Sequence, residues 1–541
     1  MAVAGHGLHG ADTSQSDLTG EFTADEARLL APYMTNLGRP VFALRNLPEV
    51  VKGALFSRYS RTEKSLRRVL LEEFLNAPEF GLGAVAEATA GPVATRNAEE
   101  FYERVLVGYG DDSVAELAGA HLAVERVSTL AAKALEDARI GLSPLEKSTR
   151  YVRFDRPGPD GRHLYHRGPE LAHRAYEPAA DHLFTTFSAL LEPVLEHLRS
   201  QYPLEPGETE RAWKTATRAK ALDLLRGLLP ASTLTNLGLF GNGRAFEYLV
   251  TKLAASELAE CRGLARSMHA ELSEVIPSFV RRALDERYGA PAVQRLTDGA
   301  AALRRLAPRT GRREEPVGVR LVEHDPDALV KVAAAALFPY SDLSLEELRG
   351  AGFDAGAVLE AIAGQRANRR HRVPRAFEHA HYTFEIVANF AAYRDLQRHR
   401  MLTQDRQLVG CDLGYDVPPQ LDAMGLGGRF REAMERAAHA HGRLAPDLGP
   451  ATAQYVVPLG FRVRWYFKVS LREVIHLCEL RTTPQGHPDY RHVAQEMFRR
   501  VQEAQPELAR LAAFVDLGPG DELERRQSER RIDEKLKALR A

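Results

Sequence analysis

One segment organises this sequence: Glu378-His-Ala-His-Tyr-Thr-Phe-Glu-Ile-Val-Ala-Asn-Phe-Ala-Ala-Tyr-Arg-Asp-Leu-Gln-Arg398-His399-Arg400. Its apolar residues recur at helical spacing, so we predict a long amphipathic helix that opens near Glu378 and ends in cations. Arginine forks bind phosphate oxygens through paired hydrogen bonds, which suits a polyanion or a cofactor whose reduced form is negatively charged. Alternatively, Arg398, His399 and Arg400 only complement the helix dipole and lie in water.

A weaker copy of this pattern lies in the first half of the chain. The stretch from Ser113 resembles the stretch from Arg375, and both are predicted to open a long helix. Arg226-Gly-Leu-Leu-Pro230 is followed twelve residues later by Asn242-Gly-Arg-Ala, and Gln454-Tyr-Val-Val-Pro458 is followed at the same distance by Ser470-Leu-Arg-Glu. This shared order predicts a head-to-tail duplication. The alternative is two unrelated helical domains that share proline and arginine spacing by chance.

Length and composition limit the possible classes of protein. A chain of 541 residues is too long for one ordinary hydrophobic core, so two domains are expected. Its 72 basic and 73 acidic residues nearly cancel, so binding to nucleic acid or to a membrane surface is not expected. The three cysteines have no metal-ligand or disulfide spacing, and no apolar run of membrane-spanning length occurs. These features predict a cytoplasmic protein without a metal site.

The predicted fold class is α+β and rich in helix. Strands are expected at Val317–Glu323 and Tyr455–Tyr466, where β-branched and aromatic residues gather. We expect a disordered tail over residues 1–20, a first repeat with an N-terminal extension over 21–315, and a second repeat over 316–541. The two repeats would form a pseudo-dimer.

Together, Arg398-His399-Arg400 and Ser470-Leu-Arg-Glu-Val-Ile-His476-Leu-Cys-Glu-Leu-Arg481 resemble the motifs of the flavin-dependent thymidylate synthases. The resemblance implies that Glu378, Arg398, His399, Arg400 and His476 bind FAD. It also implies that Arg481 contacts and activates dUMP. Two alternatives remain: Glu378 merely offsets a helix dipole, or His476 is a core histidine.

The nucleotide motif of that family falls in the other half. Ser148-Thr-Arg150-Tyr keeps its Ser-x-Arg-Tyr pattern, and Arg226 matches a further dUMP-binding arginine. Conversely, Ala138-Arg-Ile replaces Arg-His-Arg there, whereas the second half has Leu408, Gly410 and Gln454 in place of the nucleotide residues. These complementary losses predict one site divided between the halves. Alternatively, Ser148 is a helix cap and Arg150 a surface charge.

The implied activity is reductive methylation of dUMP to dTMP, with FAD as cofactor and with methylenetetrahydrofolate and NADPH as co-substrates. The chain would pair as a homodimer of pseudo-dimers. The alternative is a diverged paralogue that binds flavin, nucleotide or nucleic acid without methyl transfer. A purely structural helical scaffold is the third reading.

Overall fold

The computed structural model describes residues 22–38, 42–59, 62–76, 115–150, 152–308, 311, 314–520 and 522–540. The expected N-terminal tail, Ser113 and the tyrosine of Ser-x-Arg-Tyr lie outside these ranges. Among the described helices, none is long and apolar enough to cross a membrane.

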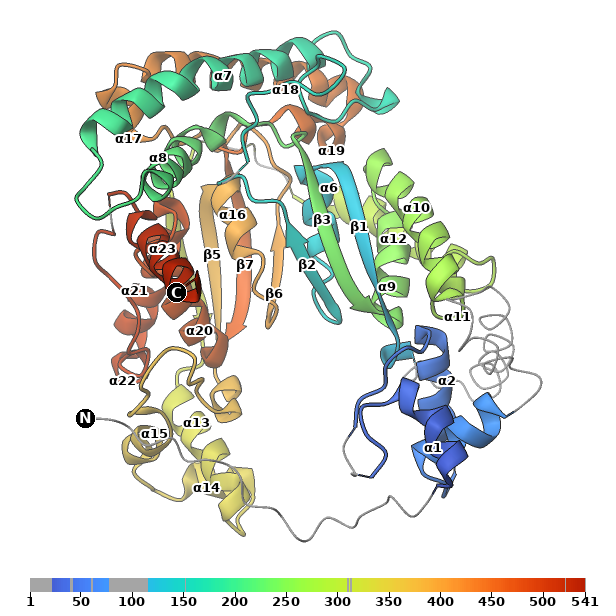
Figure 1. Ribbon diagram of the computed structural model, residues 1–541. Coiled ribbons are helices and arrows are strands. Elements are labelled where there is room, and N and C mark those ends of the chain that lie inside the picture. The colour runs from blue at the N-terminus through green and yellow to red at the C-terminus, as the bar shows by residue number, and fades with distance from the viewer. Residues whose placement is uncertain are drawn as a thin grey trace.

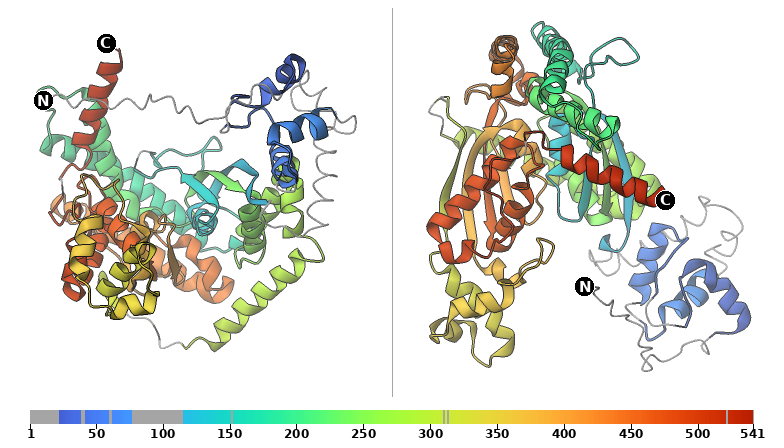
Figure 2. Two further views of the ribbon diagram at one scale, coloured as in Figure 1. Left: turned by 90° about the horizontal axis from the view of Figure 1, so that it is seen from below. Right: turned by 60° about the vertical axis from the view of Figure 1, so that its left-hand side comes forward.

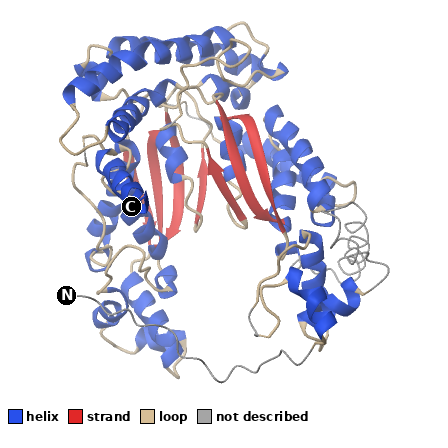
Figure 3. Ribbon diagram, viewed as in Figure 1, coloured by secondary structure: helices blue, strands red, loops and turns tan. Residues whose placement is uncertain are grey.

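Two antiparallel sheets lie side by side at the centre of the molecule (Figures 1 and 3). The first has the order β1-β3-β2, and the second has the order β4-β5-β7-β6. Their strands are β1 (Gly119–Ser128), β2 (Leu142–Glu146), β3 (Leu234–Asn242), β4 (Gly318–His324), β5 (His381–Asn389), β6 (Leu402–Arg406) and β7 (Arg462–Ser470). The predicted strand at residues 317–323 is therefore confirmed as β4.

The helices around the two sheets follow the same order in both halves. In the first half they are α6 (Thr129–Glu136), η5 (Pro169–Leu171), α7 (Tyr176–Gln201), α8 (Glu210–Leu225), η6 (Arg226–Leu228), α9 (Gly243–Ala254), α10 (Ala259–Val275), α11 (Pro277–Val280) and η7 (Arg281–Ala283). In the second half they are η9 (Arg375–His379), α16 (Phe390–Leu396), α17 (Pro419–Ala423), α18 (Gly427–Leu448), α19 (Pro450–Ala453), η10 (Gln454–Val456), α20 (Leu471–Arg481), α21 (Pro488–Ala504) and α22 (Pro506–Ala509).

Corresponding elements also begin in the same way. Ser128 caps α6 and Asn389 caps α16, each by accepting a hydrogen bond from the backbone three residues on. Asn242 and Ser470 cap α9 and α20 in the same manner. Local sequence thus sets the same strand-to-helix turn twice in each half.

The two halves meet at equivalent residues. Pro230 forms an isolated antiparallel bridge with Pro458. On either side of it, the backbone N–H of Ala231 donates to the carbonyl of Val457 (2.8 Å), and Leu459 donates to Leu229 (2.9 Å). Above this junction α7 packs along α18 (Figure 1). One continuous buried core joins both halves.

The remaining helices lie outside this symmetric centre. They are α1 (Ala24–Leu30), η2 (Ala31–Tyr33), α2 (Glu49–Tyr59), α3 (Leu66–Val69), η3 (Leu70–Leu75), α12 (Gly289–Leu306), α13 (Ala328–Leu337), η8 (Phe338–Tyr340), α14 (Leu345–Gly350), α15 (Ala355–Ala363) and α23 (Arg526–Arg540). The C-terminal α23 returns to the first half and packs on α8 (Figure 2).

The long helix predicted to open near Glu378 is wrong. Residues 381–389 form strand β5, and α-helix is confined to the seven residues of α16, with Glu378 near the end of the short helix η9. Tyr382, Phe384 and Ile386 are buried in alternation, and the strand pairs along its length with β7. The first half repeats the error, because residues 119–128 form β1 before the short α6. Pairing with a distant strand overrode an ambiguous local pattern.

The second predicted strand is correct only in part. Residues 454–456 form the short helix η10, and β7 begins at Arg462. The intervening residues make the junction with the first half, where their backbone bonds to residues 227–231. The α+β, helix-rich fold class itself is confirmed.

Candidate active site between the two halves

The C-terminal ends of α6 and α16 are joined by hydrogen bonds donated in both directions. The side-chain amide of Gln397, which caps α16, donates to the carbonyl of Lys133 (2.9 Å) in α6. In return, Arg139 donates to the carbonyl oxygens of Gln397 (3.1 Å) and His399. Arg139 occupies the place in the first half that His399 occupies in the second. It has become a bridge that positions the Arg398-His399-Arg400 segment.

Glu146, at the end of β2, binds cations from both halves. Its carboxylate contacts Lys133 (2.8 Å), Arg394 (2.9 Å) and Arg398 (3.2 Å). Its side chain is completely buried. Burial alone would raise the pKa of Glu146, but Arg394, Lys133 and Arg398 outweigh this effect and lower it to about 2. This carboxylate therefore fixes Arg398 relative to the first half.

Asp395, one turn before Arg398, is a second meeting point. Arg226 of the first half contacts its carboxylate at 3.0 Å. Burial would raise the pKa of Asp395, but the charges of Arg226, Arg398 and Arg481 hold it well below its usual range. Residues predicted separately in two halves thus surround one carboxylate, with cations in excess.

Arg150 of the first half is also buried and paired with a carboxylate. Its guanidinium Nε lies 2.8 and 3.0 Å from the two carboxylate oxygens of Asp223. Ser148 lies in the turn before it, and its hydroxyl accepts a hydrogen bond from the Arg150 backbone N–H (3.3 Å). Since Arg150 is only 7% exposed, the alternative of a surface charge is wrong. The alternative of a helix cap for Ser148 is also wrong, because the described residues between Ser148 and η5 contain no helix.

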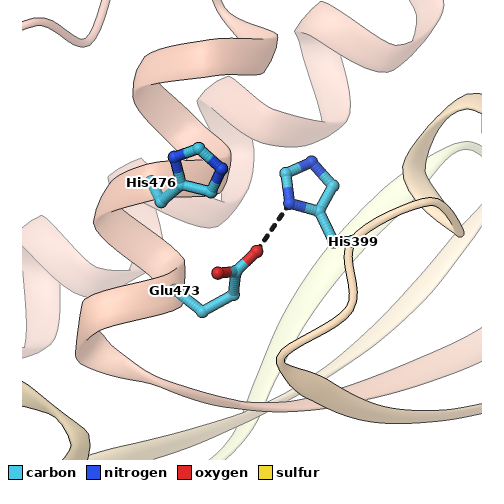
Figure 4. Close-up of side chains that lie close together, drawn as sticks. All are labelled: His399, Glu473 and His476. Atoms are coloured by element: carbon cyan, nitrogen blue, oxygen red, sulfur yellow. Dashed lines mark hydrogen bonds and ion pairs between the residues drawn. The ribbon is translucent and has the colours of Figure 1, made fainter. Parts of the chain in front are cut away.

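Arg481 ends a chain of hydrogen bonds that runs through His399 to Glu473, and Figure 4 shows the last two of these residues. Its Nε donates to His399 Nε2 (3.0 Å), and His399 Nδ1 lies 2.7 Å from Glu473 Oε1. Burial, Arg481 and Arg139 lower the pKa of His399 far below its usual value, so its ring is neutral and Nδ1–H donates to Glu473. Burial raises the pKa of Glu473. The relay fixes the orientation of the Arg481 guanidinium.

His476 lies beside this relay, one turn along α20 from Glu473 (Figure 4). Its ring centroid is 5.7 Å from that of His399. The ligand atoms of His399, Glu473 and His476 lie within 4.8 Å of one another, a spacing that suits a metal ion. However, both ring nitrogens of His399 are already engaged in hydrogen bonds, to Arg481 and to Glu473. We therefore interpret the cluster as a hydrogen-bond relay.

His476 and Glu378 line a cavity of about 200 Å³ next to the relay. Arg366, Arg369, Arg372 and Arg472 also line it. Glu378 lies in the short helix η9 and contacts Arg472 at 3.0 Å. His476 is half-buried and opens onto this cavity, so it is not a closed core histidine. An arginine-lined cavity is suited to phosphate groups.

The structure brings most of the predicted residues together. Arg226, Arg398, His399 and Arg481 share one hydrogen-bonded and electrostatic network. Arg400 stands apart because it is exposed and donates only to Ser143 (3.1 Å). The sequence did not reveal the carboxylates that hold these residues: Glu146, Asp223 and Asp395 contact the arginines, and Glu473 contacts His399. Glu146, Asp223, Asp395 and Glu473 each lie within three residues of a predicted site residue, but sequence proximity does not reveal partners from the other half.

Comparison with known proteins identifies the family. The family model described as thymidylate synthase complementing protein matches residues 68–278 and 320–507, which is more than half of the chain. The chain belongs to this family. The family resemblance found in the sequence is thereby confirmed, and the model matches each half once.

Two relatives and one solved structure are similar to all or part of this chain. A UPF0159 protein of Chlamydia muridarum is 45% identical and aligns over 95% of this chain and 99% of its own length. A flavin-dependent thymidylate synthase of Geobacter sulfurreducens is 30% identical over 37% of this chain and 87% of its own. A UMP/dUMP methylase from Streptomyces cacaoi, solved with 5-Br dUMP, is 23% identical, with a TM-score of 0.31 over 38% of this chain and 98% of its own.

Proposed function

We propose that this chain is an FAD-dependent thymidylate synthase that methylates dUMP to dTMP at a site shared by its two halves. The observation that carries the proposal is the convergence of Arg226, Arg398 and Arg481 on Asp395. Three cations around one half-buried carboxylate favour an added anion such as a nucleotide phosphate. Family membership and the flavin-dependent relative support the same chemistry.

In this proposal the chain consists of two repeats, residues 21–315 and 316–541, arranged as a pseudo-dimer. Ser148, Arg150 and Arg226 of the first repeat and Arg481 of the second would bind the nucleotide. The arginine-lined cavity beside His476 fits the phosphates of FAD, with Glu378, Arg398, His399 and Arg400 as further contacts. When bound, FAD would supply the hydride chemistry, with NADPH as reductant and methylenetetrahydrofolate as carbon donor.

The residues of this chain would bind and polarise the nucleotide. Arg481 would stabilise negative charge on the uracil ring, so we assign it as the catalytic residue. His399 and Glu473 are positioning residues, because they hold the Arg481 guanidinium through bonds of 3.0 and 2.7 Å. Arg150 and Arg226 would hold the phosphate. The enzyme would work in the cytoplasm as a homodimer of pseudo-dimers.

The test is a visible absorption titration of the purified chain with FAD, with and without dUMP. We expect a saturable spectral change that dUMP alters further. Arg398→Ala should weaken FAD binding, and Arg481→Ala should abolish the response to dUMP while FAD still binds. Arg349→Ala on the exposed side of α14 is the matched control. No spectral change with either ligand would overturn the proposal.

A diverged paralogue without methyl transfer is the second candidate. One observation favours it: Arg150, Arg226 and Arg398 each already contact a carboxylate of the chain, namely Asp223, Asp395 and Glu146. Formation of dTMP from dUMP with methylenetetrahydrofolate and NADPH separates the candidates. Flavin binding without dTMP formation would support the paralogue.

A further inference from the structure

Arg226 also borders a cavity of about 430 Å³. It lies among α8, α16, α18 and α21, so both halves line it. Its polar wall includes Arg226, Asn389, Asp416 and Asp489. The amide of Asn389 donates to Asp489 (2.8 Å) and Asp416 (2.9 Å). The predicted nucleotide and flavin residues, Arg226 excepted, do not line it.

The corresponding place in the first half is filled by a tyrosine. Ser128, at the position of Asn389, bonds Glu260 through its backbone N–H (2.7 Å). Glu260 and Asp489 are each the second residue of their helices, α10 and α21. The Tyr455 hydroxyl, from the other half, donates to Glu260 (2.8 Å), and its ring stacks on His166 at 5.2 Å.

The sequence explains why one place is filled and the other open. The matching pentapeptides are Arg226-Gly-Leu-Leu-Pro230 and Gln454-Tyr-Val-Val-Pro458. Gly227 is therefore the counterpart of Tyr455, and it has no side chain to fill the cavity. A side chain at Gly227 would begin 3.2 Å from the Phe430 ring, a tight approach. The cavity thus exists where an aromatic ring is absent from the matching peptide.

Arg226 has guanidinium donors at this cavity that are not used in hydrogen bonds. Its Nη1 contacts Asp395, but its buried Nε and Nη2 have no hydrogen-bond partner in the part of the chain that the structure describes. Nη2 lies 3.9 Å from Asp489 Oδ2, beyond hydrogen-bonding distance. Gln454, at the matching position, is satisfied: it accepts from Val409 (2.9 Å) and donates to Ala451 (3.0 Å). A buried guanidinium with unmet donors calls for an acceptor.

We propose that this cavity is a second binding site that takes a nucleoside whose base carries an N–H beside a C=O. The ring N–H donates to Asp489, the carbonyl accepts from Arg226, and the base occupies the place that the Tyr455 ring fills in the other half. A donor and an acceptor side by side match the separated Asp489 and Arg226 atoms. The cavity is within the usual size range for small-molecule sites. Because Arg226 also contacts Asp395, a nucleoside bound in this cavity would affect the proposed active site through Arg226.

The inference is tested by isothermal titration calorimetry of the full chain with four nucleosides. Uridine and inosine present the required N–H beside a C=O, whereas cytidine and 3-methyluridine lack that N–H. We expect uridine and inosine to bind at least tenfold more tightly than the other two. Equal affinity for all four, or binding by none, overturns the proposal.

Variants locate the site. Asp489→Ala should weaken uridine binding about tenfold or more, since it removes a charged acceptor. The conservative Asp489→Asn should weaken it less while keeping the fold, and Asp422→Ala on exposed α17 is the control. Arg481→Ala should leave uridine binding unchanged. Loss of uridine binding in Arg481→Ala would instead assign it to the proposed active site, and unchanged binding in Asp489→Ala would also contradict the inference.

Discussion

Strand β2 ends at Glu146, and the corresponding strand β6 ends at Arg406. Both face the same position on their central strands, Leu237 of β3 and Trp465 of β7. The carboxylate of Glu146 binds three cations, two of them from the other half. Arg406 instead lies 5.5 and 5.7 Å from the rings of Phe390 and Tyr393. One scaffold therefore carries opposite charges at equivalent points.

This difference shows how two halves of similar architecture can depend on each other. The first half supplies the carboxylate at the junction, and the second supplies Arg394 and Arg398. Neither half could bury its own charges alone, because an unpaired buried charge is costly. Once charges were divided in this way, the halves could no longer separate without loss.

The largest effect should follow from Glu146→Gln. The substitution leaves Arg394 buried without a counter-charge among the described residues, while Lys133 keeps its ion pair with Glu136, so the free energy of unfolding should fall by about 3–5 kcal/mol. The matched change, Arg406→Met, removes only a cation–π contact and should cost about 1 kcal/mol or less. Urea denaturation followed by fluorescence of Trp213 and Trp465, one in each half, measures both. Equal losses would show that the two positions do not differ in this way.

Arg226→Gln introduces into the first half the residue type that the second half has at the matching position, Gln454. The variant loses the cation that contacts Asp395, and dUMP affinity should fall about 10- to 100-fold, as for a lost charged hydrogen bond. Calorimetric titration with dUMP checks this expectation. The control is Arg431→Gln, which breaks a pair with Asp422 on the exposed surface. If Arg226→Gln bound dUMP normally, the divided site would be refuted.

The N-cap residues of α21 and α10 differ in whether their side chains can bind a proton. The N-cap of α21 is His487, whereas the N-cap of α10 is Leu258. Burial, together with Arg226, lowers the pKa of His487 to about 3, so it stays neutral in the folded chain. The unfolded chain takes up a proton below about pH 6.5. Stability should therefore fall as pH drops from 6.5 towards 3, by up to about 1.4 kcal/mol per unit.

His487→Asn keeps a capping side chain and should remove this contribution to the pH dependence. Urea denaturation at pH 7, 6 and 5 measures the slope. Exposed His492→Asn is the control and should retain the wild-type slope. An unchanged slope in His487→Asn would mean that other groups, such as buried His399, account for the acid sensitivity.

The sequence predicted the family and the site arginines better than the elements that carry them. Motif spacing located Arg226, Arg398 and Arg481, because each is tied to a short local pattern. The strand β5 was taken for helix, since its pairing with β7 connects residues about eighty positions apart. The acidic partners, Glu146 and Asp395, also depend on contacts across halves. Local patterns do not encode such contacts.

The smallest effect on stability concerns two ion pairs at corresponding places. Glu378 contacts Arg472 at 3.0 Å, and Glu116 contacts Arg244 at 2.9 Å. Replacing either glutamate by glutamine should change the free energy of unfolding by less than about 1 kcal/mol, because partly exposed pairs contribute little.

Of these two glutamates, only Glu378 lines the arginine-rich cavity beside His476. Glu378→Gln should therefore change FAD affinity several-fold, by altering the Arg472 guanidinium that lines the same cavity and would face the proposed cofactor, whereas Glu116→Gln should leave it unchanged. Parallel FAD titrations of the two variants decide the matter: equal affinities would remove Glu378 from the flavin site and leave the pair as a structural remnant shared by both halves.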